Sequence, residues 1–119
     1  MKEPRSAMSE TDVITGYHAH VYYDPADRSG AERLRAAIDE RFEVALGRWH
    51  DKPIGPHPQA SYQIAFAPEL FHALVPWLAL NRGDLTVFLH PLTGDDLADH
   101  RDYAIWLGES DVLDLSVLT

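Results

Sequence analysis

The chain alternates between segments whose hydrophobic residues recur at every second position and segments where they recur at every third or fourth. Residues 14–23 (ITGYHAHVYY) are dense in aromatic and β-branched side chains and end at an Asp-Pro pair, which predicts a strand. Apolar residues at helical spacing over 31–42 predict an amphipathic helix of about four turns, which Asp27 can cap. Alternation over 42–46 indicates a second strand, whose further course the pattern does not fix.

The second half of the chain begins with a loop. Three prolines and a glycine within residues 53–58 preclude regular structure there. Alternation resumes over residues 60–66, which predicts a third strand. Pro68 suits the first turn of a helix that ends near residues 81–83, and residues 85–90 then predict a fourth strand.

This order, β-α-β-β-α-β, predicts a ferredoxin-like fold of the α+β class, an antiparallel sheet with both helices on one face. Residues 94–106 predict a further helix closed by Gly108, and alternation over 113–117 indicates a short terminal strand. A chain of 119 residues has room for one core. We therefore expect a flexible tail over residues 1–12 and a single domain over residues 13–119.

The composition excludes several classes of protein. Nineteen Asp and Glu against ten Lys and Arg leave a net charge of −9, which repels phosphate backbones, so no nucleic acid partner is expected. No apolar stretch approaches the roughly 20 residues of a membrane-spanning helix, and the polar N-terminal segment lacks the apolar core of a signal peptide. We therefore expect a cytoplasmic protein with no membrane partner. Because the chain has no cysteine, any metal must be held by nitrogen and oxygen.

Histidine is unusually frequent, with seven residues that all lie inside patterned sequence. His18 and His20 are two positions apart on the first predicted strand, so both rings project from one face, about 7 Å apart. The apolar residues of that strand point to the opposite face, under the helices. His90 has the same polarity on the fourth strand, which neighbours the first strand in a ferredoxin-like sheet. The three imidazoles can therefore converge on one ion.

The proline-rich loop supplies a fourth imidazole. His57 stands between Pro56 and Pro58, which restrict its backbone. A rigid imidazole suits acid–base catalysis or the completion of a metal site. His50 lies in the same segment and is less constrained.

Structural interpretations of the same residues remain open. A His-x-His pair is a short motif that is also typical of surface or hydrogen-bonded structural histidines. His57 can have a packing role in its loop. His72 is expected to face solvent, and His100 to pair with Asp96, four positions earlier on a helix.

Five segments of the chain resemble, in order, the DOPA 4,5-dioxygenase-like family. They are YHAHVYYD, GRWHDKPIGPHP, YQIAF, LVPWLALNRGDLTVFLHP and TGDDLADHRDYAIWLG, and together they span residues 17–108. The resemblance implies a small cytosolic protein with a ferredoxin-like fold, commonly dimeric. The activity that it implies is extradiol ring opening of L-DOPA or a related catechol with Fe(II) and O2.

The resemblance gives the histidines roles. His18, His20 and His90 are the expected ligands of Fe(II), and His57 is the expected acid–base residue, with His50 in reserve. Zinc or another divalent metal can occupy the same imidazoles in a preparation, but zinc cannot pass electrons. No carboxylate stands out as a further ligand, although Glu43 and Asp51 are available.

The expected substrate suggests further residues. A catechol that bears an amino acid favours aromatic walls and a cation, and Tyr22, Trp49, Phe88 and Arg48 are the candidates, with Arg82 also available. Because Tyr22 and Phe88 would lie on an uncovered sheet face, we expect a homodimer.

Three other functions compete with the oxygenase hypothesis. A binding or sensing module could hold a small aromatic molecule without oxidising it, and weak Fe(II) affinity would favour that function. Cofactor-free oxygenation predicts activity that survives chelation. Zinc-dependent hydrolysis would also suit three imidazoles and a water.

Overall fold

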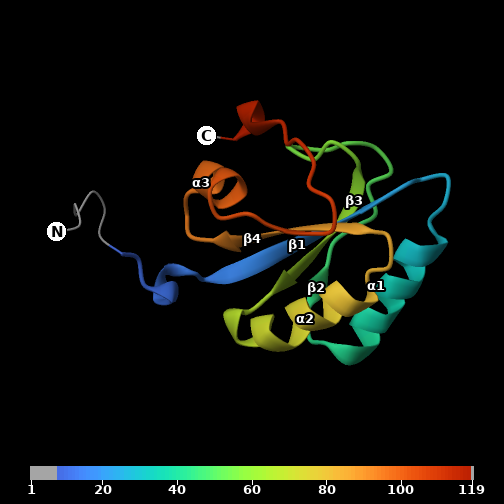
Figure 1. Ribbon diagram of the computed structural model, residues 1–119, viewed down its shortest axis with the longest axis horizontal. Helices are drawn as coiled ribbons and strands as arrows, with labels where there is room; N and C mark the ends of the chain where they lie inside the picture. The colour runs from blue at the N-terminus through green and yellow to red at the C-terminus, as the bar shows by residue number, and fades with distance from the viewer. Residues whose placement is uncertain (1–7, 119) are drawn as a thin grey trace.

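The computed structural model describes residues 8–118 and consists of one sheet with helices packed on it (Figure 1). The strands are β1 (Gly16–Tyr23), β2 (Ala45–Leu46), β3 (Ala60–Phe66), β4 (Thr86–Leu92) and β5 (Ile105–Leu107). The helices are α1 (Ser29–Arg41), α2 (Phe71–Asn81) and α3 (Asp96–Arg101), and short 3-10 turns cover Thr11–Val13, Pro68–Leu70 and Leu115–Val117.

The sheet confirms the predicted α+β, ferredoxin-like arrangement. Its strand order is β2-β3-β1-β4-β5, and each neighbouring pair is antiparallel. β1 therefore lies between β3 and β4, as the β-α-β-β-α-β order requires. The short strand β5 extends the sheet beyond β4.

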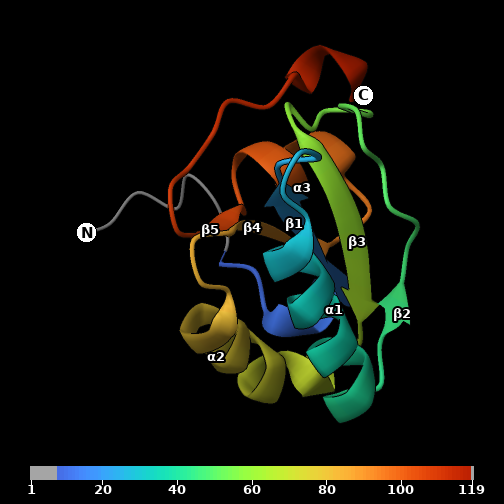
Figure 2. The same ribbon diagram turned by 90° about the vertical axis from the view of Figure 1, so that its right-hand side faces the viewer.

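The hydrophobic core lies between the sheet and the two longer helices. Figure 2 shows α1 and α2 together on one face of the sheet. Ala19 and Val21 of β1 are fully buried there against Leu34 and Ile38 of α1. Burial of Val21, Leu34 and Ile38 contributes roughly 1.5–3 kcal/mol for each side chain, so this layer holds the strands in register. The predicted polarity of β1 is confirmed.

The opposite face carries the histidines, and the chain itself covers the part over β1 and β4. α3 and the C-terminal segment lie on this side, away from α1 and α2 (Figures 1 and 2). Tyr22 is 2% exposed and Phe88 is 0% exposed. The expectation that these two side chains would need a second subunit to cover them is therefore wrong.

The C-terminal region differs from its prediction. The helix predicted over residues 94–106 ends at Arg101, and Trp106 lies in β5, opposite Phe88. Gly108 follows that strand with a φ of 90°, so it ends a strand and not a helix. Leu115–Val117 form a 3-10 turn where a strand was predicted.

Smaller corrections concern the ends of elements. α1 begins after Arg28 with no side-chain cap, because the Asp27 carboxylate accepts a hydrogen bond from the Ser29 hydroxyl at 3.0 Å. β2 contains only Ala45 and Leu46, and β4 continues to Leu92.

The predicted tail is only partly visible. Residues 1–7 lie outside the described residues, as does Thr119, and residues 11–13 form a 3-10 turn. No helix of residues 8–118 is long and apolar enough to cross a membrane.

Candidate functional site

Three histidines meet on the face of the sheet away from α1 and α2. Strand pairing places His18 of β1 directly opposite His90 of β4. His20 is the next residue on this face of β1, and its Nε2 lies 3.1 Å from Nε2 of His90. One nitrogen from each of the three rings lies within 4.8 Å of the others. The structure thus brings together the three residues that the sequence put on one face.

The nitrogen geometry fits a divalent metal. The Nδ1 of His90 lies 3.0 Å from the carbonyl oxygen of Pro91, and a carbonyl can only accept, so Nδ1 carries the proton. The Nε2 of His90 therefore presents a lone pair towards His20. With metal–nitrogen distances of about 2.1 Å, neighbouring ligand positions separate two nitrogens by about 3.0–3.4 Å. The contact between His20 and His90 falls in that range.

Burial keeps these rings neutral. It lowers the pKa of His20 well below its usual value, with help from the neighbouring imidazoles, and lowers the pKa of His90 to about 4. Burial also lowers the pKa of the half-buried His18. Neutral imidazole is the form that binds metals. The cluster is therefore ready to coordinate an ion at neutral pH.

His57 joins the cluster from the proline-rich loop. Its ring centroid lies 4.1 Å from that of His20, and its Nδ1 is 2.8 Å from the hydroxyl of Tyr22. Burial lowers the pKa of His57 to about 4 and raises the pKa of Tyr22, so a neutral imidazole is bonded to a protonated phenol. Tyr22 thus fixes the orientation of His57.

His100 belongs to the cluster, although the sequence did not indicate it. Its ring centroid is 4.0 Å from that of His90, and its Nδ1 lies 2.7 Å from the backbone oxygen of Asp96. The expected pairing with Asp96 therefore involves the carbonyl and not the carboxylate. No local signal could have placed His100 here, because its position depends on how α3 folds back over β4. His72 is exposed, as predicted.

A pocket of about 240 Å³ opens beside His20 and His57. It is lined by His20, His50, Ile54, Gly55, Pro56, His57, Ser61 and Gln63. His50 therefore lies near the histidine cluster but at the wall of the pocket. A more voluminous groove, about 590 Å³, lies at the end of the sheet and includes none of the histidines, so the smaller pocket is the relevant one.

The predicted aromatic walls lie elsewhere. Phe88 packs beneath the rings, 5.8 Å from His20 and 4.6 Å from Trp106 between centroids, and is completely buried. Trp49 packs on the other face of the sheet, 4.8 Å from Tyr62 and under the guanidinium of Arg28. Phe88 supports the site from below, and Trp49 does not reach it.

A β-bulge explains the position of Trp49. The Gly47 amide donates to the Gln63 carbonyl, and His50 exchanges two backbone bonds with Ser61. Arg48 and Trp49 therefore stand together opposite one residue of β3, Tyr62. Because of the extra residue, His50 lies on the histidine face and Trp49 lies on the helix face. Arg48 is exposed and does not line the pocket.

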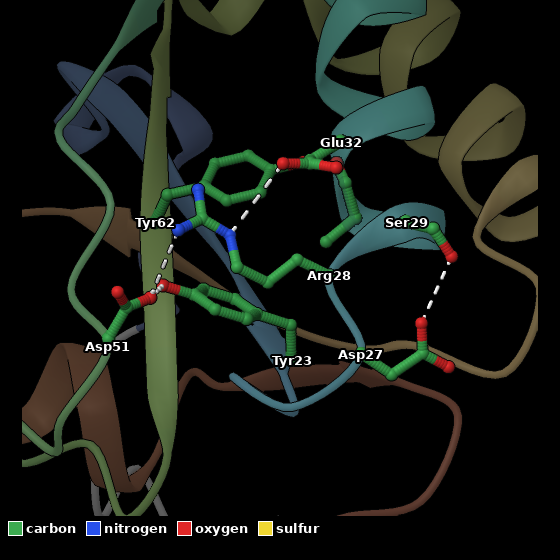
Figure 3. Close-up of polar contacts among 8 residues, drawn as sticks. Tyr23, Asp27, Arg28, Ser29, Glu32, Asp51 and Tyr62 are labelled. Carbon is green, nitrogen blue, oxygen red and sulfur yellow. Dashed lines mark hydrogen bonds and ion pairs between the residues drawn. The ribbon is translucent and has the colours of Figure 1, made fainter.

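The two available carboxylates are also away from the cluster. Asp51 accepts a 2.6 Å hydrogen bond from the Tyr23 hydroxyl and pairs with Arg28 at 3.5 Å (Figure 3). Glu43 is exposed and lines the groove at the end of the sheet. Tyr22 and Tyr23 thus attach the loop over residues 47–59 to β1 from the two faces of the sheet.

The chain belongs to the Dopa 4,5-dioxygenase family, whose model matches residues 17–117. It is 36% identical to the DOPA 4,5-dioxygenase of Amanita muscaria, over 95% of this chain and 57% of that protein. An uncharacterized 21.2 kDa protein of Botryotinia fuckeliana is also 36% identical, over 92% of this chain and 66% of that protein. The chain therefore spans somewhat more than half of one curated relative and just under two thirds of the other.

A solved structure is more similar. A Nostoc punctiforme protein, provisionally named a dioxygenase, is 51% identical and superposes with a TM-score of 0.90. The match covers 92% of this chain and 96% of that one. The fold described above is therefore shared with a dioxygenase-like protein of nearly the same extent.

Proposed function

We propose that this protein is a non-haem iron dioxygenase that opens the ring of L-DOPA or a related catechol next to the diol, with both atoms of O2 entering the product. The convergence of His18, His20 and His90 on one point carries the proposal. Membership of the Dopa 4,5-dioxygenase family supports it. We further propose a single domain over residues 13–119 that works in the cytoplasm.

The three histidines of the cluster would hold Fe(II). The ion would supply the redox chemistry, by binding catechol and O2 together and passing electrons between them. The protein contributes neutral imidazoles whose direction is already fixed, since His90 is held by Pro91 and the strands hold His18 and His20 in register. Zinc would fit the same nitrogens without supporting oxidation.

His57 would move the protons of the reaction. It reaches the cluster from a stiff loop, and Tyr22 occupies its Nδ1, which leaves Nε2 to exchange a proton with a catechol hydroxyl. When Nδ1–H donates to the Tyr22 oxygen, the neutral ring has a lone pair at Nε2 that can accept that proton and return it later. His50, at the pocket wall, is the reserve candidate. Among the other substrate-binding candidates, Tyr22 acts through His57 and Phe88 supports the rings, whereas Arg48 and Trp49 lie outside the pocket.

A homodimer remains a prediction. The chain itself covers Tyr22 and Phe88, so these side chains do not require a second subunit. Light scattering of the metal-loaded protein decides the oligomeric state.

Anaerobic reconstitution with Fe(II) tests the proposed function. The loaded protein should consume O2 with a catechol and form a coloured ring-opened product. H20A should lose both iron and turnover, whereas H57A should keep iron and lose turnover. H72A, on the exposed face of α2, is the matched control and should keep both.

The same experiment separates the alternatives. Full iron occupancy in H20A would contradict the ligand set. Catechol binding without O2 uptake would indicate a binding or sensing module. Turnover that survives chelation would indicate cofactor-free oxygenation, and hydrolysis with zinc would indicate a hydrolase.

A further inference from the structure

Three rows of side chains cross the histidine face of the sheet. Strand pairing gives the rows His90-His18-Ala65-Ala45, Phe88-His20-Gln63-Gly47 and Thr86-Tyr22-Ser61-His50. At the β1 and β4 ends of these rows, His20, Tyr22, Phe88 and His90 are buried, whereas His18 and Thr86 are partly exposed. On the β3 and β2 side, Ala65, Gln63 and Gly47 are partly exposed and Ala45 is exposed. The pocket beside His20 and His57 opens on this side, so we take it as the approach of a substrate to the metal.

This uncovered part, which we call the shelf, consists of Ala45, Gly47, Gln63 and Ala65, and the buried Ser61 lies beside it. Its side chains are small or neutral, and none is charged. The pocket that opens from it adds Ile54, Gly55 and Pro56, which are also neutral. Apart from the histidines, every residue of the shelf and the pocket has a neutral side chain.

The cations nearest in the sequence do not line the pocket. Arg48 lies in the bulge opposite Tyr62 and does not line the pocket, and Lys52 is exposed outside it. Arg82 donates to the carbonyl of Leu85 at 3.0 Å. Arg35 donates to the Gly47 carbonyl at 2.7 Å, with its guanidinium over Tyr62 of the helix face. Within residues 8–118, therefore, no arginine or lysine lines the pocket.

Acidic groups lie at the edges of the histidine face, and Glu43 lines the groove that includes Ala45 and Ala65 of the shelf. Glu43 is the exposed residue two positions before Ala45. Asp96 lies near enough to His18 to raise its pKa, although burial lowers it by more. Asp111 raises the pKa of Tyr22, again with a smaller effect than burial. With a net charge of −9, the protein also repels anions at longer range.

We propose that the site takes catechols whose side chain carries no carboxylate, that a catecholamine is the best fit, and that L-DOPA is disfavoured for its carboxylate. The inference rests on the proposed function. A carboxylate on the shelf would find no arginine or lysine lining the pocket to pair with, whereas an ammonium group would meet Glu43, which lines the groove beside Ala45 and Ala65. With or without a side-chain carboxylate, the diol of the catechol would be bound by the metal and the imidazoles.

Dopamine and L-DOPA are a matched pair, because they differ only in the carboxylate. With the Fe(II)-loaded protein, kcat/KM for dopamine should exceed that for L-DOPA by about tenfold or more. Anaerobic calorimetry should give a similar ratio of Kd values, which measures binding without turnover. Because the preference is electrostatic, it should shrink as salt rises from about 0.01 M to 0.5 M. 4-Methylcatechol should be preferred to 3,4-dihydroxybenzoate for the same reason.

Gln63→Arg, in the middle of the shelf, should improve L-DOPA relative to dopamine by adding the missing counter-charge. Ala36→Arg makes the same charge change on the exposed face of α1, across the sheet, and should leave the ratio as in the wild type. If Gln63→Arg fails to fold, the ratio of kcat/KM for dopamine to that for L-DOPA in the wild-type protein still tests the inference.

The outcomes separate the two proposals. Equal or better binding and turnover of L-DOPA would overturn the inference and leave the proposed function intact. Failure of every catechol to bind or react would overturn both.

Discussion

At the residue scale, two consecutive tyrosines of β1 have opposite surroundings. The Tyr22 hydroxyl contacts Nδ1 of His57 at 2.8 Å on the histidine face, and the Tyr23 hydroxyl donates to Asp51 at 2.6 Å on the helix face. Both contacts attach the same loop to the same strand. Only the first involves a residue that we propose to handle protons.

Tyr22→Phe should therefore distinguish the role of the hydroxyl in orienting His57 from its contribution to the stability of the fold. Loss of the buried hydrogen bond should lower the free energy of unfolding by about 1 kcal/mol and free the ring of His57 to turn. We expect kcat to fall about tenfold, with iron content unchanged, as for other groups that orient catalytic side chains. Denaturant titration, metal analysis and kinetics of the loaded protein measure the three quantities.

Tyr23→Phe is the matched control. It removes one hydroxyl from the same strand and should cost a similar or smaller free energy, because Asp51 is exposed to solvent. Its kcat should stay at the wild-type value. Equal losses of kcat in both variants would show that the hydroxyls act only by holding the loop.

At the scale of secondary-structure elements, the regular strands could be predicted from the sequence and the irregular segment could not. His18, His20 and His90 lie on uninterrupted alternating strands, so their common face follows from the two-residue period. After β2, the bulge at Arg48 and Trp49 inserts one residue and reverses the alternation. Trp49 therefore lies on the helix face and cannot form the aromatic wall that was expected for the substrate.

The position of His100 on α3 could not be predicted from the sequence either. His100 reaches His90 only because the helix folds back over β4, where the buried carboxylate of Asp99 binds the backbone amide of Thr93 at 2.9 Å. That turn depends on tertiary contacts, and helical spacing around His100 shows only its local neighbours.

Trp49→Ala tests the corrected position of that side chain. Because the ring packs against Tyr62 and beneath Arg28 on the helix face, its loss should lower the free energy of unfolding by about 2 kcal/mol. The ratio of kcat/KM between any two catechols should not change. Arg48→Ala, at the adjacent exposed position, should change neither stability nor the ratio. An altered ratio in Trp49→Ala would place the indole in the substrate site after all.

At the scale of the whole molecule, the histidine cluster links distant parts of the chain. His18, His57, His90 and His100 come from β1, the proline-rich loop, β4 and α3. The three proposed ligands come from β1 and β4, so a metal bound to them would link these two strands in the folded state only. Metal binding should therefore stabilise the entire fold.

Fe(II) or Zn²⁺ at about 100 times its Kd should raise the free energy of unfolding by about 2.7 kcal/mol, which corresponds to a rise in Tm on the order of 10 °C. Differential scanning fluorimetry under anaerobic conditions measures the shift. His90→Gln should lose it, and His72→Gln, on the exposed face of α2, should retain it. An equal shift in both variants would mean that the metal binds elsewhere.

The metal-free protein should lose stability in mild acid. Burial lowers the pKa of His57 and of His90 to about 4, whereas both rings titrate near 6.5 in the unfolded chain. Below pH 6.5 the unfolded chain therefore binds protons that the folded protein does not, so the free energy of unfolding falls as pH falls from about 6.5 to about 4. Each such histidine contributes a slope of up to about 1.4 kcal/mol per pH unit. Urea titrations of chelator-treated protein between pH 8 and pH 4 measure this slope, which His57→Gln should reduce by about that amount. A slope unchanged in His57→Gln would show that the ring is not held neutral by its burial among the other histidines.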